Sequence, residues 1–257
     1  MTSMEAGRTA RIEPFTVMSA IGSVTARALL GRRRTLLMLL VAGAPVLVGL
    51  LVRLANGGGR PDRLVPILEG LTVVTVLPLI ALVFGTAALG SELDDGTAVH
   101  TLTKPIPRWT IVLPKLLVAG GLTALLLVAS TVLAGLLIGG TGSHELQITF
   151  AFAIGILVGS FVYAAIFLAL SVFTSRGLII GLAYALIWEG LLAGALPGTQ
   201  LLSVREYVRG IIEMFAPAGT LHSLVGSTGL VAALVALVVI TIVATLRLSV
   251  YEVRSAE

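Results

Sequence analysis

The sequence predicts an all-α integral membrane protein with six transmembrane helices, and two observations support this prediction. Of its 257 residues, 57% are apolar and only 12% are charged, and the mean hydropathy is +1.06. Soluble domains carry about 25% charged residues. Several uncharged apolar runs also reach the roughly 20 residues that a helix needs to cross about 30 Å of hydrocarbon. These runs fill most of the chain, so we expect one membrane domain and no separate soluble domain.

Six apolar runs are the candidate spans, and their even number places both termini on the same side of the membrane. If the N-terminus is inside, 12 of the 17 basic residues fall in inner segments, as the retention of positive charge in the cytoplasm requires. The sequence therefore predicts a multi-pass protein of the cell membrane with cytoplasmic termini. The predicted spans are residues 35–54, 65–89, 109–138, 148–173, 178–196 and 229–246, within a transmembrane domain of residues 35–247.

Both ends of the chain lie outside these spans. Residues 1–34 combine arginines with apolar side chains that recur every three or four residues, at Phe15, Met18, Ile21, Val24 and Ala28. This pattern predicts a cytoplasmic tail followed by an amphipathic connecting helix on the inner membrane surface. A disordered basic tail that ends in a stop-transfer cluster is the alternative. Residues 248–257 are predicted to form a cytoplasmic C-terminal tail.

The outer segment 197–228, before the last predicted span, is too apolar for a free loop. Its charged residues also recur every three or four positions, at Arg205, Glu206, Arg209 and Glu213. This pattern predicts a short re-entrant or interfacial helix that keeps its charges in water, dips its other face into the bilayer and ends before Pro217.

Four Gly-x-x-x-Gly pairs could bring helices close together. However, 29 glycines among 257 residues give roughly three such pairs by chance. We therefore assign no packing partner to these pairs, which are Gly135/Gly139, Gly155/Gly159, Gly177/Gly181 and Gly190/Gly194.

The sequence lacks the constellations of an enzyme active site. There is no cysteine, and the three histidines lie in three different loops. His144-Glu145 begins a zinc-protease pattern, but Ile148 stands where the second histidine ligand would be. No phosphate-binding glycine loop precedes a lysine, and the arginines flank apolar runs instead of forming a nucleic-acid stripe. We expect no catalytic residue, metal site, cofactor or nucleic-acid partner for this chain.

Glu189, next to Trp188, is the one clear carboxylate inside a predicted span. A charge at that depth is costly unless it is paired or hydrated, so these two residues are the candidates for a substrate pathway. The alternative is a carboxyl group near the outer end of its span that is neutral or hydrogen-bonded to a neighbouring helix. Glu69 lies only a few residues into its span, where we expect its side chain to reach headgroup water.

The inner segment between the second and third spans is the most polar of the inner loops, and it carries a family resemblance. It contains an acidic residue, a Gly-Thr pair, a Pro-hydrophobic-x-Arg turn and a lysine, and in these it resembles the permease subunits of ABC transporters of the ABC-2 type. It departs from their pattern at two places: the acidic Asp94/Asp95, where a basic residue is common nearby, and Pro114, where glycine is common. The matching residues are Glu92, Gly96-Thr97, Pro105-Ile106-Pro107-Arg108 and Lys115.

This resemblance implies a half-transporter. Two permease copies, most simply a homodimer, would enclose an export path in a bacterial or archaeal type plasma membrane, in contact with membrane lipid. Two copies of a separate ATP-binding cassette ATPase would bind ATP and Mg and drive transport, and the coupling segment 91–108 would dock into that ATPase. The implied coupling residues are Glu92, Asp94, Asp95, Gly96, Thr97, Pro105, Arg108 and Lys115. A secondary transporter or channel that works without ATP is the alternative.

Overall fold

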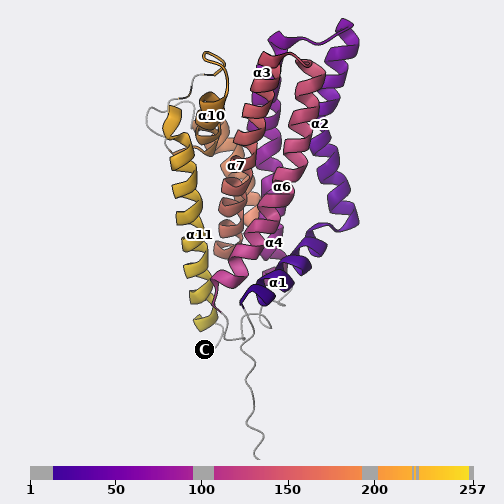
Figure 1. Cartoon of the computed structure of the whole chain (residues 1–257). Coiled ribbons are helices and arrows are strands. Elements are labelled where there is room, and N and C mark those ends of the chain that lie inside the picture. Colours follow the sequence, from indigo (N-terminus) through magenta and orange to yellow (C-terminus); the bar gives the residue numbers. More distant parts are fainter. Residues whose placement is uncertain (1–13, 95–106, 193–201, 222, 224–225, 255–257) are drawn as a thin grey trace, which may run out of the picture.

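The computed structural model describes residues 14–94, 107–192, 202–221, 223 and 226–254, and every regular element in this part of the chain is a helix (Figure 1). Five helices are long and apolar enough to cross a membrane. The predicted all-α class is therefore confirmed for the described residues. The five helices are Arg34–Asn56, Pro61–Gly90, Trp109–Ile138, Ser143–Phe173 and Gly229–Ser249.

The predicted connecting helix is present as α1 (Pro14–Leu29), which lies obliquely at one end of the bundle and leads into α2 (Arg32–Asn56) (Figure 1). Of the predicted apolar positions, Ile21 is partly buried against the core, whereas Val24 is 61% exposed. Only part of the apolar pattern therefore packs on the bundle, where α1 contacts α6. The location of α1 on the inner membrane surface remains a prediction.

The second long span contains an irregular segment. It begins with η1 (Pro61–Arg63) and α3 (Leu64–Ile67), continues as the π-helical segment η2 (Leu68–Val76), and ends as α4 (Leu77–Asp94). A π-helix shifts the backbone hydrogen bonds from i→i+4 to i→i+5 and therefore changes which side chains face the neighbouring helices. In this span, the π-helical segment is the part that carries Glu69.

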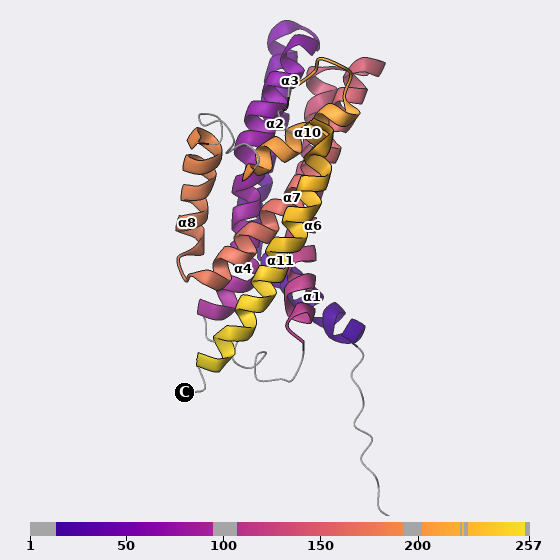
Figure 2. The same cartoon turned by 90° about the vertical axis from the view of Figure 1, so that its left-hand side faces the viewer.

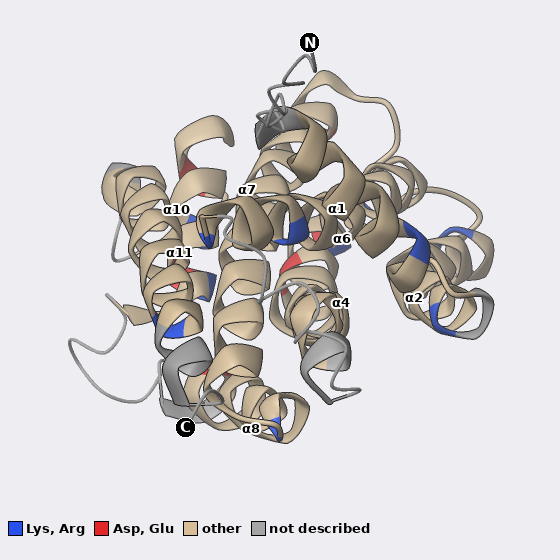
Figure 3. Cartoon of the chain, turned by 90° about the horizontal axis from the view of Figure 1, so that it is seen from below, with Lys and Arg blue, Asp and Glu red and all other residues tan. Residues whose placement is uncertain are grey.

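The centre of the bundle consists of α4, α6 (Trp109–Ile138) and α7 (Ser143–Phe173), which contact one another along their lengths. Glycine permits part of this close packing. A Cβ atom added at Gly85 of α4 would lie only 2.9 Å from the Cβ of Phe167 on α7. Seen along the bundle axis from the α1 end, the helices carry few charged positions (Figure 3). An apolar core of this kind suits a membrane interior.

The predicted span 178–196 corresponds to a shorter helix. α8 (Gly177–Ala183) continues directly into a second π-helical segment, η3 (Tyr184–Leu192), and Gly177–Gly190 is too short to count among the long apolar helices. Residues 193–196 lie outside the described part of the chain. The six-span topology therefore remains a prediction. The placement of α1 and the end of α11 (Gly229–Arg254) at the same end of the bundle agrees with an even number of crossings (Figure 1).

Within the predicted re-entrant segment, the structure contains α10 (Val204–Phe215), followed by η5 (Gly226–Thr228) and α11. α10 ends two residues before Pro217, close to the predicted stop. The helix lies in the half of the bundle away from α1 and contacts α7 and α11 (Figure 1). Its buried residues include Val208 and Ile211, so α10 is part of the protein core.

Candidate functional site

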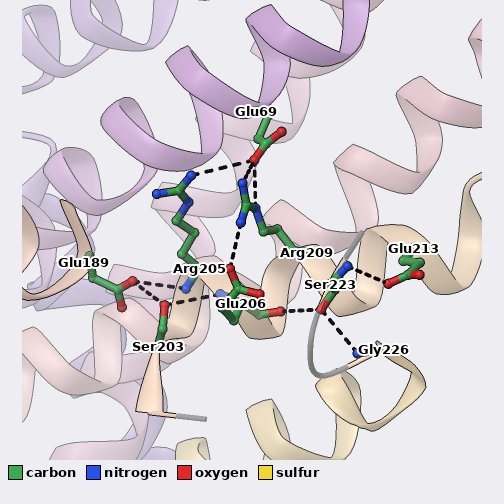
Figure 4. A network of polar contacts seen from close by, with 9 residues as sticks. All are labelled: Glu69, Glu189, Ser203, Arg205, Glu206, Arg209, Glu213, Ser223 and Gly226. Atoms are coloured by element: carbon green, nitrogen blue, oxygen red, sulfur yellow. Dashed lines mark hydrogen bonds and ion pairs between the residues drawn. The ribbon is translucent and has the colours of Figure 1, made fainter. Parts of the chain in front are cut away.

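A network of charged and polar side chains surrounds α10 and connects it to two other spans (Figure 4). α10 begins after Ser203, whose hydroxyl accepts a hydrogen bond from the backbone N–H of Glu206 at 3.3 Å. Serine at this position replaces one of the hydrogen bonds that the first turn of a helix lacks. The helix start is therefore defined by its own sequence before any other span contributes.

Glu189 of η3 binds the N-terminal end of α10. The residue is 4% exposed, and its carboxylate accepts hydrogen bonds from the hydroxyls of Tyr184 at 3.1 Å and Ser203 at 2.7 Å. It also accepts from the backbone N–H groups of Val204 at 2.9 Å and Arg205 at 3.4 Å. The first N–H groups of a helix have no intrahelical acceptor and carry a partial positive charge, so a carboxylate is stabilised there. Glu189 thus has hydrogen-bond partners on a neighbouring helix, the alternative that the sequence left open.

Glu69 of η2 binds the charged face of α10. Arg209 donates to the Glu69 carboxylate through Nε at 2.7 Å and also through Nη2, and the Nη2 of Arg205 lies 3.7 Å from the same oxygen. Nη1 of Arg209 donates to Glu206 at 2.7 Å. The side chain of Glu69 is only 17% exposed. Glu69 is therefore paired with two arginines far along the chain, and its contact with headgroup water stays a prediction.

Three of the four charged side chains of α10 are partly or largely buried, although the sequence predicted that all of them would point into water. The side chains of Arg205 and Arg209 are 23% and 24% exposed and that of Glu206 is 9% exposed. Desolvation lowers the pKa of Arg209, but its hydrogen bonds to Glu69 and Glu206 outweigh this and raise the pKa above its ordinary value. The guanidinium of Arg209 therefore stays charged, with the carboxylates of Glu69 and Glu206 as its partners inside the protein.

Both carboxylates that contact α10 lie in π-helical segments, Glu69 in η2 and Glu189 in η3. π-helical turns are rare and occur frequently at functional sites. Their irregular backbone is not visible in an apolar pattern, since η2 is as apolar as α4, which continues the same span. The structure therefore joins two irregular segments through one short helix.

The apolar face of α10 packs into a groove made by two glycines of α7. A Cβ atom at Gly155 would lie 2.7 Å from Cγ1 of Ile212, and one at Gly159 would lie 2.6 Å from Cγ2 of Val208. The pair Gly155/Gly159, to which the sequence assigned no partner, thus accommodates α10. At the other end, the side-chain amide of Gln147 on α7 donates to the carbonyl of Phe215 at 3.2 Å.

The segment after α10 is attached to the same helix. The backbone N–H of Ser223 donates to the carboxylate of Glu213 at 3.0 Å, and the N–H of Gly226 donates to the hydroxyl of Ser223 at 3.2 Å (Figure 4). A Cβ atom at Gly229, where α11 starts, would lie 2.9 Å from the carbonyl oxygen of Tyr207. α10 and the start of α11 therefore form one closely packed unit.

The predicted coupling residues are only partly within the described chain. Glu92 and Asp94 lie in the last turn of α4, and Arg108 directly precedes α6. Lys115 is buried inside α6, where its Nζ donates to the carbonyl of Ala88 on α4 at 2.8 Å. Lys115 thus connects the two helices that flank the coupling segment. Asp95, Gly96, Thr97 and Pro105 lie outside the described residues.

No metal centre is evident in the part of the chain that the structure describes. No group of three or more His, Asp or Glu side chains there could hold a metal ion. Trp188, the neighbour of Glu189, is partly exposed on η3. The network around α10 holds this short helix in a fixed position between the neighbouring helices.

Comparison with known families decides the assignment. A family model described as ABC-2 family transporter protein matches residues 31–189, well over half of the chain. The chain belongs to the ABC-2 transporter family. None of the curated proteins compared with it matches significantly. The resemblance suggested by the inner segment is thus confirmed at the level of the family, and the ABC-2 permease is a multi-pass membrane protein.

The family match also divides the network. Glu69 and Glu189 of the ABC-2 permease lie inside the matched region, which includes all of η2 but ends within η3, at Glu189 itself. α10 and α11 lie beyond residue 189. The family match therefore gives no information about α10, and its contacts are known from the structure of this chain.

Proposed function

We propose that the chain is the permease subunit of an ATP-driven exporter, in which two permease copies form the substrate path and a separate ATPase supplies the energy. The family match over residues 31–189 carries this proposal. ATP and Mg would bind to the ATP-binding cassette partner. In this proposal the chain contributes transport and has no catalytic step of its own.

The coupling segment 91–108 is the proposed contact with the ATPase. It connects the end of α4 to the start of α6, and the hydrogen bond from Lys115 to Ala88 holds these two helix ends together. A displacement of the segment would therefore reach both helices at once. Because Lys115 is buried, its part in coupling would be to hold α4 and α6 and not to contact the ATPase.

The proposed dimer follows from the distribution of polar groups. Among the described residues, the membrane-embedded carboxylates Glu69 and Glu189 are already bound to α10. A single bundle of this kind offers little polar lining for a path of its own, whereas two copies could enclose one between them. Glu189 and Trp188 remain candidates for that path.

The test is to isolate the tagged chain in detergent from its native membrane and to determine the subunit composition by native mass spectrometry. We expect two copies of the 26.6 kDa permease with two copies of an ATPase that contains a phosphate loop. A chain that is always recovered without an ATPase, and that transports in vesicles without ATP, would instead support a secondary transporter or channel.

The proposed orientation places both termini and the coupling segment in the cytoplasm. Since the protein contains no cysteine, single cysteines can be introduced for labelling with a membrane-impermeant thiol reagent in intact cells. We expect Ser3→Cys, Thr101→Cys and Ser255→Cys to be protected and Ser143→Cys to react, because α7 begins at the end opposite to α1. Labelling of Thr101→Cys from outside would reverse the proposed orientation.

A further inference from the structure

An apolar cavity of about 330 Å³ lies between α7, the α8–η3 helix and α11. Its lining includes Ile166 and Phe173 of α7, Ile180 of α8 and Val243 of α11. Tyr184 also lines it, but the hydroxyl of that side chain donates to Glu189. In Figure 2, α8 stands at one side of the bundle. The cavity therefore presents hydrocarbon to its occupant at the edge of the protein, where membrane lipid is the solvent.

Two arginines lie at one end of this cavity, and each is one helical turn away from a residue that lines it. On α11, Arg247 follows Val243 by four positions, and its guanidinium carbon lies 5.4 Å from the ring centre of Phe173, which lines the cavity. On the other side, the N–H of Ile180 donates to the carbonyl of Arg176 at 3.1 Å, which places Arg176 one turn before that lining residue. Both arginines belong to the end of the bundle that carries α1 and the C-terminal end of α11.

The two arginines have no acidic partner among the described residues. Arg247 Nε is buried and lacks a hydrogen-bond acceptor within that part of the chain. The Arg176 side chain is exposed, and no ion pair is present for it in the same part. A buried polar group without a partner is costly, so an anion at this position would be stabilised. The positive charge and the adjacent apolar cavity together match a molecule with one anionic end and one hydrocarbon end.

We propose that this cavity is a binding site for an anionic phospholipid from the leaflet on the α1 side, with an acyl chain between α8 and α11 and the phosphate at Arg247 and Arg176. Basic pockets between transmembrane helices are a known way of binding anionic lipid headgroups. A second copy of the chain would have to place both an apolar side chain in the cavity and a carboxylate at the arginines. One phospholipid supplies an acyl chain for the cavity and an anionic phosphate for the arginines. The cavity shares Tyr184 with the α10 network. Lipid binding there does not depend on coupling to an ATPase.

The test uses the full-length chain in nanodiscs with phosphatidic acid that carries a photoactivatable diazirine in its acyl chain. We expect mass-spectrometric adducts on peptides from α8 and α11. Val243→Trp, which fills the cavity, should abolish them, whereas Ile242→Trp at the neighbouring exposed position should not. Adducts elsewhere, or an unchanged yield in Val243→Trp, would overturn the site.

The headgroup is tested with the arginines. Arg247→Gln and Arg176→Gln should each lower retention of the anionic probe about fivefold, as expected for loss of one basic residue near a charged lipid. Arg53→Gln, at the end of α2 away from α1, should not change it. A phosphatidylcholine probe with the same acyl chain should bind more weakly, and excess inorganic phosphate should not displace the lipid. Equal retention of both lipids, or a disulfide between two copies of Val243→Cys in place of lipid adducts, would refute the proposal.

Discussion

Replacing Glu69 with alanine should lower the free energy of unfolding by about 3 kcal/mol, because the partly buried guanidinium of Arg205 would lose its ionic partner. Arg209 would keep Glu206, but Arg205 would lose its ion pair. The loss should detach the charged face of α10 from η2. The measurement is the free energy of unfolding in detergent for Glu69→Ala, Arg209→Ala and the double variant.

In that comparison, the double variant should be less destabilised than the sum of the two single variants, since the pair interacts directly. Asp62→Ala is the matched control: its ion pair with Arg60 spans 3.3 Å, and the two side chains are 44% and 64% exposed. An exposed pair of this kind should contribute less than about 1 kcal/mol. Strictly additive effects of Glu69→Ala and Arg209→Ala would contradict the ion pair.

Replacing Glu189 with glutamine should loosen the N-terminal turn of α10 although the side-chain shape is kept. The two carboxylate oxygens accept from the hydroxyl of Ser203 and the backbone N–H groups of Val204 and Arg205. In glutamine, an NH2 group replaces one of these oxygens, and since it is itself a donor it cannot accept these hydrogen bonds. Hydrogen bonds to a charged group stabilise by about 1.5–3 kcal/mol. We expect the backbone N–H of Val204 to exchange with deuterium about tenfold faster or more.

Glu213→Gln is the control for this prediction, because it lies on the same helix and accepts from the backbone N–H of Ser223. It should leave exchange at Val204 unchanged. The same experiment separates the two roles of Glu189. If Glu189→Gln changes transport while exchange at Val204 stays at its original rate, the residue acts in the substrate path and not as the anchor of α10.

Hydropathy was sufficient to predict the five long helices, because crossing hydrocarbon is a local property of about 20 consecutive residues. It was less informative for the segment 178–196, where the described helix is shorter and partly π-helical. Proline and charge spacing located α10 to within a few residues. Its environment was not predictable, since Glu69 and Arg209 are 140 positions apart in the sequence.

The groove on α7 shows why chance rates limit inference from short motifs. Gly155 and Gly159 could not be distinguished in the sequence from the other glycine pairs. They are distinguished in three dimensions by Val208 and Ile212, which occupy the space that a Cβ atom would need. The apolar face of α10 is the signal that could have identified them, because this face also has to pack against another helix.

We propose that a separate ATPase drives this ABC-2 permease through segment 91–108, and ATP hydrolysis in reconstituted membranes tests this coupling. The permease is combined with the ATPase that co-purifies with it, and the wild type is compared with Gly96→Val and Arg108→Glu. We expect both variants to assemble with the ATPase but to lose most of the stimulation of ATP hydrolysis by the permease. Normal stimulation in both variants would show that segment 91–108 is only a connector.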